Sequence, residues 1–221
     1  MTLDSRRLPL AILLGVFLLV GAALSLYYVG PAAYADFGTL RARAEVEQMR
    51  DGQKRMPPVA EWGRLRNELV SALTNPPDNA QLLDDIAFLY AFRAQSMEDV
   101  PELEDLRQSL LAESVIYYRA ASKLRPMFPY GWAHLALAKH YVGEADAELW
   151  SAFDKALAYG RNEPAVQRML AEIAFARWAS LDPKRADAIR VLIAELPEIL
   201  QKPLLDQAAH FLVSIALPVK P

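Results

Sequence analysis

Residues 125–141 read RPMFPYGWAHLALAKHY and carry one tryptophan, two histidines, two tyrosines, one lysine and one arginine. On a helix, Trp132, Leu135, Ala136 and Lys139 fall at i, i+3, i+4 and i+7 and so form one stripe. This order of aromatic, leucine, small and long side chains is typical of the first helix of a tetratricopeptide unit, where the small residue lets the paired helix approach. The stretch therefore predicts a helical repeat.

The chain on either side of this stretch shows helical periodicity and no alternating strand pattern. Short turns marked by proline or glycine separate the segments. The predicted helices cover residues 59–74, 80–96, 105–124, 129–142, 146–159, 164–180, 182–196 and 197–217. Short helices joined in this way indicate an all-α fold, an antiparallel α-solenoid of tetratricopeptide-like helix pairs.

The repeats are degenerate, because Pro126 and Pro164, which mark equivalent exit turns, lie 38 residues apart, against the usual period of about 34. The residues that we assign to the structural repeat signature are Pro126, Tyr130, Trp132, Leu135, Ala136, Phe153, Ala156, Pro164 and Trp178.

A second feature lies near the N-terminus. Residues 8–29 form an uncharged, apolar run of 22 residues, long enough as a helix to cross a hydrocarbon layer roughly 30 Å thick. Arg6 and Arg7 precede this run, and the next basic residue is Arg41. The positive-inside rule then predicts a single-pass anchor with a cytoplasmic N-terminus and the remaining chain across the membrane.

The alternative is a cleaved signal peptide, because Ala33-Tyr34-Ala35 forms an A-x-A site. The apolar run exceeds the usual signal h-region of about 7–15 residues, which favours the anchor. The sequence leaves cleavage at this site open. The predicted organisation is a cytoplasmic tip and transmembrane anchor (residues 1–30), a stalk or linker (31–58) and a tetratricopeptide-like helical domain (59–221).

Composition restricts the function. The chain of 221 residues is 53% hydrophobic, carries a formal net charge of −3 and contains no cysteine. Such a balance supports a packed core and gives no global field to recruit nucleic acid. The missing cysteines exclude disulfides, thiol chemistry and cysteine-ligated zinc.

The candidate chemical groups do not assemble into a recognisable site. His134 and His140 are six residues apart, roughly 120° around a helix, which is unsuitable for sharing a metal ion. No carboxylate lies between Arg125 and His140 to orient them locally, although a partner from elsewhere in the chain is open. The acidic run Glu98, Asp99, Glu102, Glu104 and Asp105 lacks the spacing of a calcium loop, so we interpret it as a solvated connector, with contact to a basic partner as the alternative.

Phosphate-binding, dinucleotide-binding and hydrolase motifs are also missing. We therefore predict no catalytic, cofactor-binding or metal-binding residues. A groove lined by Arg125, Lys139 and Arg161 that binds an anionic glycan is a weaker alternative.

The segment YRAASKLRPMFPYGWAHLALAKHYVGEADAELWSAFDKALAYGRNEPAVQRMLAEIAFARW resembles the core of VpsP-type polysaccharide-biosynthesis proteins of proteobacteria. The matching elements include Tyr118-Arg119, Leu124-Arg125-Pro126, Pro129-Tyr130, Trp132-Ala133, Leu135-Ala136, the turn from Glu148 and Trp150 into Phe153, the Glu163-Pro164-Ala165-Val166-Gln167 segment and Trp178. The resemblance implies an anchor in the bacterial inner membrane, a periplasmic tetratricopeptide-like domain and a place in exopolysaccharide assembly.

Together, these observations predict a non-catalytic scaffold of exopolysaccharide (capsule or biofilm polymer) biosynthesis or export, whose partners are integral-membrane polymerase and export proteins. One alternative is an assembly factor for another envelope machine, of the pilus or cytochrome-maturation type, because the same architecture serves many functions. The other is a glycan-binding or glycan-active periplasmic protein.

Overall fold

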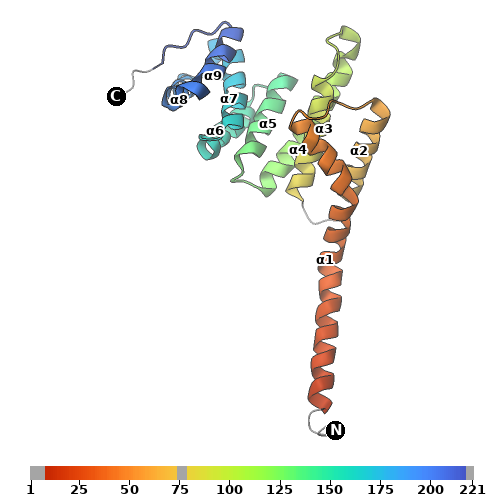
Figure 1. Cartoon of the computed structure of the whole chain (residues 1–221). Helices are drawn as coiled ribbons and strands as arrows, with labels where there is room; N and C mark the ends of the chain where they lie inside the picture. Colours follow the sequence, from red (N-terminus) through yellow and green to blue (C-terminus); the bar gives the residue numbers. More distant parts are fainter. Residues whose placement is uncertain (1–7, 74–78, 218–221) are drawn as a thin grey trace. The chain divides into compact units, whose positions relative to one another are not determined.

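A computed structural model describes residues 8–73 and 79–217, except for the side chains of residues 8–12, 28, 29 and 31–36. The described residues form an all-α protein whose helices pack as antiparallel pairs (Figure 1). The chain divides into two compact units, Met1–Leu82 and Leu83–Pro221, with the boundary in the first turn of α3.

The first unit is built on a long helix, α1 (Leu8–Arg50), which packs against α2 (Val59–Ala72). Ala42 and Val46 of α1 and Leu65 and Leu69 of α2 are fully buried. Gly52 ends the first helix in the left-handed region, at a φ of 73°, which a glycine adopts without steric strain.

An ion-pair network reinforces this pair of helices. The carboxylate of Glu45 in α1 accepts from Lys54 in the turn at 2.6 Å and from Arg64 in α2 at 3.4 Å. The hydrogen bond from Lys54 lowers the pKa of Glu45, so this carboxylate is ionised and binds the turn and the second helix to the first.

The N-terminal half of α1 exposes apolar side chains. Leu13, Phe17, Leu19 and Tyr27 are each more than 70% exposed. Among the described residues, none of the helices combines the length and apolarity needed to cross a membrane. The predicted anchor is only partly covered by the described residues, because the side chains of residues 8–12, 28 and 29 are not among them. Arg6 and Arg7 lie outside the described residues altogether.

The second unit contains the rest of the chain. Its elements are α3 (Ala80–Gln95, from Leu83 onward), the 3₁₀ helix η1 (Pro101–Leu103), α4 (Glu104–Leu124), α5 (Pro129–Val142), α6 (Ala147–Gly160), α7 (Pro164–Ala176), the 3₁₀ helix η2 (Trp178–Ser180), α8 (Pro183–Glu195) and α9 (Glu198–His210). α5 is central, since it contacts its sequence neighbours α4 and α6 and also α7 (Figure 1).

The helix starts and stops follow local chemistry. Proline occupies the first turn of α5, α7 and α8, where its missing N–H leaves no helical partner unsatisfied. Asp146 caps α6 by accepting from the Leu149 amide at 2.9 Å, and Gly143 ends α5 at a φ of 88°. The turn between α5 and α6 is therefore short and well defined.

Small residues allow the central helices to pack closely. Ala133 and Ala136 of α5 and Ala156 of α6 are fully buried in one continuous core that extends to α9. A Cβ built on Gly160 would lie 2.6 Å from the Cβ of Pro129, so the end of α6 approaches the start of α5 more closely than an alanine allows.

Two helices are shorter than predicted by four residues or more. α7 ends at Ala176 and is followed by η2, so the predicted helix 164–180 is wrong beyond residue 176. α9 ends at His210, and Leu212 follows at a φ of 57°, which breaks the helical path. The helical pattern of residues 105–124 also predicts that Leu106 faces inward, but Leu106 is 51% exposed in the first turn of α4.

Beyond α9, residues 211–217 form a tail that leaves the helical path. Phe211, Val213, Ile215 and Leu217 pack against the core, whereas the residues between them are exposed. This period of two is the pattern of an extended segment with one buried face, and it corrects the predicted helix through residue 217.

Candidate binding groove

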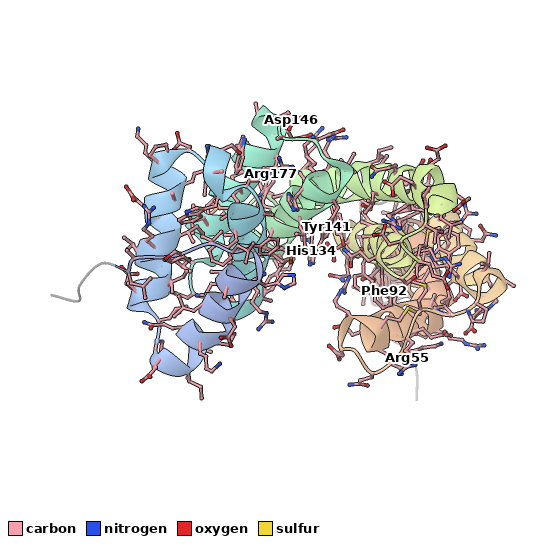
Figure 2. The ribbon with its side chains drawn as sticks, turned by 90° about the horizontal axis from the view of Figure 1, so that it is seen from above. Arg55, Phe92, His134, Tyr141, Asp146 and Arg177 are labelled. Atoms are coloured by element: carbon pink, nitrogen blue, oxygen red, sulfur yellow. The ribbon has the colours of Figure 1, made fainter. Side chains whose placement is uncertain are left out.

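The second unit contains a small apolar cavity of about 150 Å³, bordered by α3, α5 and α7 with Tyr118 of α4. α3 contributes Phe88, Ala91, Phe92 and Gln95, and α5 contributes His134, Leu137, Ala138 and Tyr141. Each set follows the spacing i, i+3, i+4 and i+7, which places its members on one helix face. Figure 2 shows Phe92 on α3 and His134 and Tyr141 on α5.

Aromatic rings form much of the cavity wall. Phe88 and Phe92 stack with their ring centroids 5.3 Å apart, and Tyr118 lies 5.1 Å from His134, centroid to centroid. Met169 of α7 contributes a flexible thioether to the wall. Such walls suit an apolar group, and the flexible methionine side chain can adjust to bound groups of somewhat different shape.

His134 brings a polar atom to this apolar wall. Its Nδ1 lies 3.5 Å from Oδ1 of Asp84 in α3, the partner from elsewhere in the chain that the sequence left open. That distance exceeds an ordinary hydrogen bond. His134 is therefore held between a carboxylate and the Tyr118 ring, at the edge of the cavity.

Tyr141 marks the other edge of the cavity. Its hydroxyl donates to the carboxylate of Glu172 in α7. Burial raises the pKa of the Tyr141 phenol above its usual range, and the Glu172 carboxylate raises it further. The phenol is thus neutral at physiological pH and links α5 to α7.

A second cavity, of about 580 Å³, adjoins the first, because Gln95 and Tyr141 line both. Its walls include Asp99 from the connector after α3, and Glu104 and Arg107 from α4. We call the two cavities together the groove: the first is the apolar pit and the second is the acidic end.

His140 faces a different environment from His134. Nδ1 of His140 accepts a hydrogen bond at 3.0 Å from Nε of Arg177, which is labelled in Figure 2. Burial, together with the Arg177 charge, lowers the pKa of His140 to about 4, so the ring is neutral at pH 7. Within residues 8–73 and 79–217, no group of side chains suitable for a metal ion is found.

Lys139 does not line a groove with Arg125 and Arg161, which corrects that expectation. Its side chain is only 1% exposed, and its Nζ donates to Glu144, Asp146 and Glu148, at 2.5, 2.9 and 2.9 Å. These contacts raise the pKa of Lys139 although burial opposes it. The lysine is therefore a structural ion-pair centre at the turn between α5 and α6.

The other two cations of that expectation, Arg125 and Arg161, have different neighbours. Arg161 pairs with Glu195 of α8 at 2.5 Å, and the guanidinium of Arg125 lies 4.3 Å from the centre of the Phe128 ring. Neither contact involves Lys139, so the three cations are engaged with different groups of the chain.

The repeat-signature residues lie mainly in and around the core. Leu135, Ala136, Phe153 and Ala156 are buried, and Trp178 packs against the core from η2. Pro126 follows α4 in the turn before α5, and Pro164 opens α7.

The two remaining signature aromatics form polar contacts. Tyr130 donates to Glu163 at 2.7 Å. Trp132 is half-buried: its Nε1 donates to the Pro126 carbonyl at 2.8 Å, and Lys155 lies 3.8 Å from the ring centre. The signature thus describes packing and turn contacts, with the groove on other positions of the same helices.

The groove residues Phe88, Phe92, Leu137, Tyr141 and Met169 were not among the sequence-predicted sites. A signal was present, since the α3 and α5 sets repeat the same helical spacing 46 residues apart. Pairing the two stripes requires knowing that α3 and α5 border the same cavity, which spacing alone does not supply.

Comparisons with known proteins add no identity: no family model, curated protein or solved structure matches this chain. The resemblance to VpsP-type proteins therefore stays a prediction.

Proposed function

We propose that this protein is a non-catalytic, membrane-anchored scaffold of exopolysaccharide biosynthesis or export that holds a polymerase or export protein through the groove. The observation that carries the proposal is the pair of adjoining cavities on α3, α5 and α7, of about 150 and 580 Å³. A largely apolar concave site with a few polar groups at its edges is suited to binding.

The repeat architecture supports a scaffold. We infer that α3 with α4, α5 with α6, and α7 with α8 are degenerate tetratricopeptide-like pairs and that α9 closes the array. The contact of α5 with α7 as well as with α6 fits stacked pairs, in which first helices of neighbouring units meet. Stacked first helices supply a continuous surface for an extended partner.

The exposed apolar half of α1 supports the anchor. Large side chains such as Leu13, Phe17 and Leu19 face outward along α1, and the sequence run of 22 uncharged residues has the length of a membrane span. With Arg6 and Arg7 on the cytoplasmic side, the helical repeats lie on the periplasmic side of a bacterial inner membrane.

An anchored scaffold gains effective concentration toward integral-membrane enzymes, because both partners share one surface. The resemblance to VpsP-type proteins supports polysaccharide assembly as the pathway. An assembly factor for a pilus or cytochrome pathway would use the same architecture, so the test must separate these pathways.

Deleting the gene in its host tests the proposal. We expect the secreted polymer to be lost or shortened, and the full chain to restore it. A deletion strain with unchanged polymer amount and length contradicts the exopolysaccharide role, and a pilus or cytochrome defect in that strain favours the alternative.

A photo-crosslinking amino acid in place of the exposed Gln95 then identifies what contacts the groove in cells. The same crosslinker at Glu113, an exposed α4 residue that lines neither cavity, is the matched control. We expect a polymerase or export protein to be captured from Gln95 and not from Glu113. Equal capture from both positions would show that the groove does not hold the partner.

A further inference from the structure

The size of the apolar pit limits what it can hold. Its volume is about 150 Å³, and an apolar protein cavity of roughly that volume accepts one benzene-sized ring. The pit therefore fits a single large side chain, either an aromatic ring or a branched aliphatic group.

The pit is accessible from outside. Phe88, Phe92, Leu137 and Met169 are each half-buried, so they combine packing within the domain with exposure at the pit. An entering side chain would complete the burial of these four apolar groups, which is the main source of affinity in such a site.

The charge at the acidic end determines which side chain of a bound partner is favoured next to the pit. Asp99, Glu104 and Arg107 line this cavity, and the stretch that supplies them, residues 98–107, carries five carboxylates and a single guanidinium, a formal charge of −4. Arg107 is engaged within the domain, because it donates to Asp99 at 3.0 Å and to the Glu98 carbonyl at 2.8 Å and lies 3.4 Å from Glu104. The excess negative charge favours a cation in a bound partner.

Gln95 and Tyr141 connect the site for an apolar side chain with the site for a cation, since both residues line the pit and the acidic end. A side chain seated in the pit therefore has its neighbours along the partner chain beside the acidic end. One short segment can satisfy both sites.

We propose that the groove binds a partner protein segment in which an aromatic or branched aliphatic residue is closely followed by lysine or arginine. This inference rests on the proposed scaffold function and specifies the chemistry of its partner.

The test uses the full chain in detergent micelles and fluorescein-labelled Gly-Ser peptides that differ only in their central residues. The central sequences are Phe-Lys-Lys, Ser-Lys-Lys, Phe-Glu-Glu and Ser-Glu-Glu. We expect Phe-Lys-Lys to bind most tightly by fluorescence anisotropy, with the Kd raised about tenfold by either single change. Added salt should weaken Phe-Lys-Lys more than Phe-Glu-Glu, because it screens attraction to the acidic end.

Two variants at exposed positions test the site with little risk to folding. Gln95→Trp should block the passage between the two cavities, and Asp99→Lys should reverse a charge at the acidic end. Both should weaken Phe-Lys-Lys about tenfold. Glu113→Trp and Glu113→Lys make the same kinds of change on α4 and should leave the Kd unchanged.

The outcomes separate this inference from the scaffold function. Equal binding of all peptides, or equal loss in the Gln95 and Glu113 variants, overturns the proposed segment chemistry, even where crosslinking from Gln95 captures a partner in cells. Selective binding of Phe-Lys-Lys that Gln95→Trp abolishes supports it, even where gene deletion leaves the polymer unchanged and the exopolysaccharide role fails.

Discussion

Arg119 of α4 donates two hydrogen bonds to the carboxylate of Glu148 in α6, from Nε at 2.6 Å and from Nη2 at 2.8 Å. The same carboxylate accepts from Lys139 of α5 at 2.9 Å. One acidic side chain therefore connects three helices at the turn between α5 and α6.

Replacing Lys139 with alanine should lower the free energy of unfolding by about 1–3 kcal/mol, because it removes a buried side chain and its ion pairs to three partly exposed carboxylates. Lys123→Ala, at an exposed position of α4, should change it by less than about 0.5 kcal/mol. Urea unfolding of the full chain in detergent micelles measures both. Equal effects of the two substitutions would contradict a structural role for Lys139.

Glu148 should make the domain sensitive to acid. Its hydrogen bonds, first from Arg119 and then from Lys139, lower its pKa from 4.5 to about 2. The unfolded chain therefore binds the proton first, so the stability from Glu148 is full above pH 4.5 and is lost as the pH falls from about 4.5 to 2. Unfolding measured across this range should show a shallower loss for Glu148→Gln than for the unmodified chain.

His140 should add a separate dependence of similar size at higher pH. Its pKa is lowered from 6.5 to about 4 by burial and by Arg177. The unfolded state takes up the proton first here as well, so stability is retained above pH 6.5 and declines as the pH falls from about 6.5 to 4. His140→Gln keeps an acceptor for Arg177 and should make the free energy of unfolding less dependent on pH over this interval. If the variant keeps the same pH dependence as the unmodified chain, the dependence does not come from His140.

Gly160 and Gly63 should respond in opposite directions to the same substitution. Gly160→Ala places a Cβ 2.6 Å from Pro129, and this overpacking should cost about 1–3 kcal/mol. A Cβ on Gly63, inside α2, meets nothing within 4 Å, so Gly63→Ala should stabilise the helix by up to about 1 kcal/mol. Thermal melting of the two variants would show shifts of opposite sign.

Trp132 should contribute less than a fully buried core tryptophan. Because the side chain is half-buried, we expect Trp132→Ala to cost about 2 kcal/mol, below the 3–5 kcal/mol typical of a complete core truncation. Trp132→Phe should cost about 1 kcal/mol, mainly through loss of the hydrogen bond to Pro126. A melting midpoint that neither change moves would show that the ring contributes nothing to packing.

The sequence predicted the helical elements well where capping chemistry was local. α5 spans the predicted residues 129–142, bounded by Pro129 and Gly143, and α4 differs from its prediction by one residue at its start. Proline at a first turn and glycine after a last turn act within a few residues, so one sequence suffices to read them. The stripe of Leu135, Ala136 and Lys139 was also placed correctly on one buried face.

The candidate site was harder to predict because it depends on contacts between distant parts of the chain. Phe92 and Tyr141 are 49 residues apart, and neither belongs to a recognised motif. Lys139 was assigned to a packing stripe, but the convergence of Glu144, Asp146 and Glu148 on its ammonium depends on the turn that Gly143 allows. The alternation in the tail was visible in the sequence, yet a short apolar run reads as helix or strand.

The tail has a further consequence. Since its buried and exposed side chains alternate, removing one residue next to Leu212 would exchange the two faces of all that follows and place Ser214 and Ala216 where Val213 and Ile215 pack. Removing two residues would preserve the parity and lose only one inward side chain. The length of this segment, counted as odd or even, is therefore a structural property of the protein in its own right.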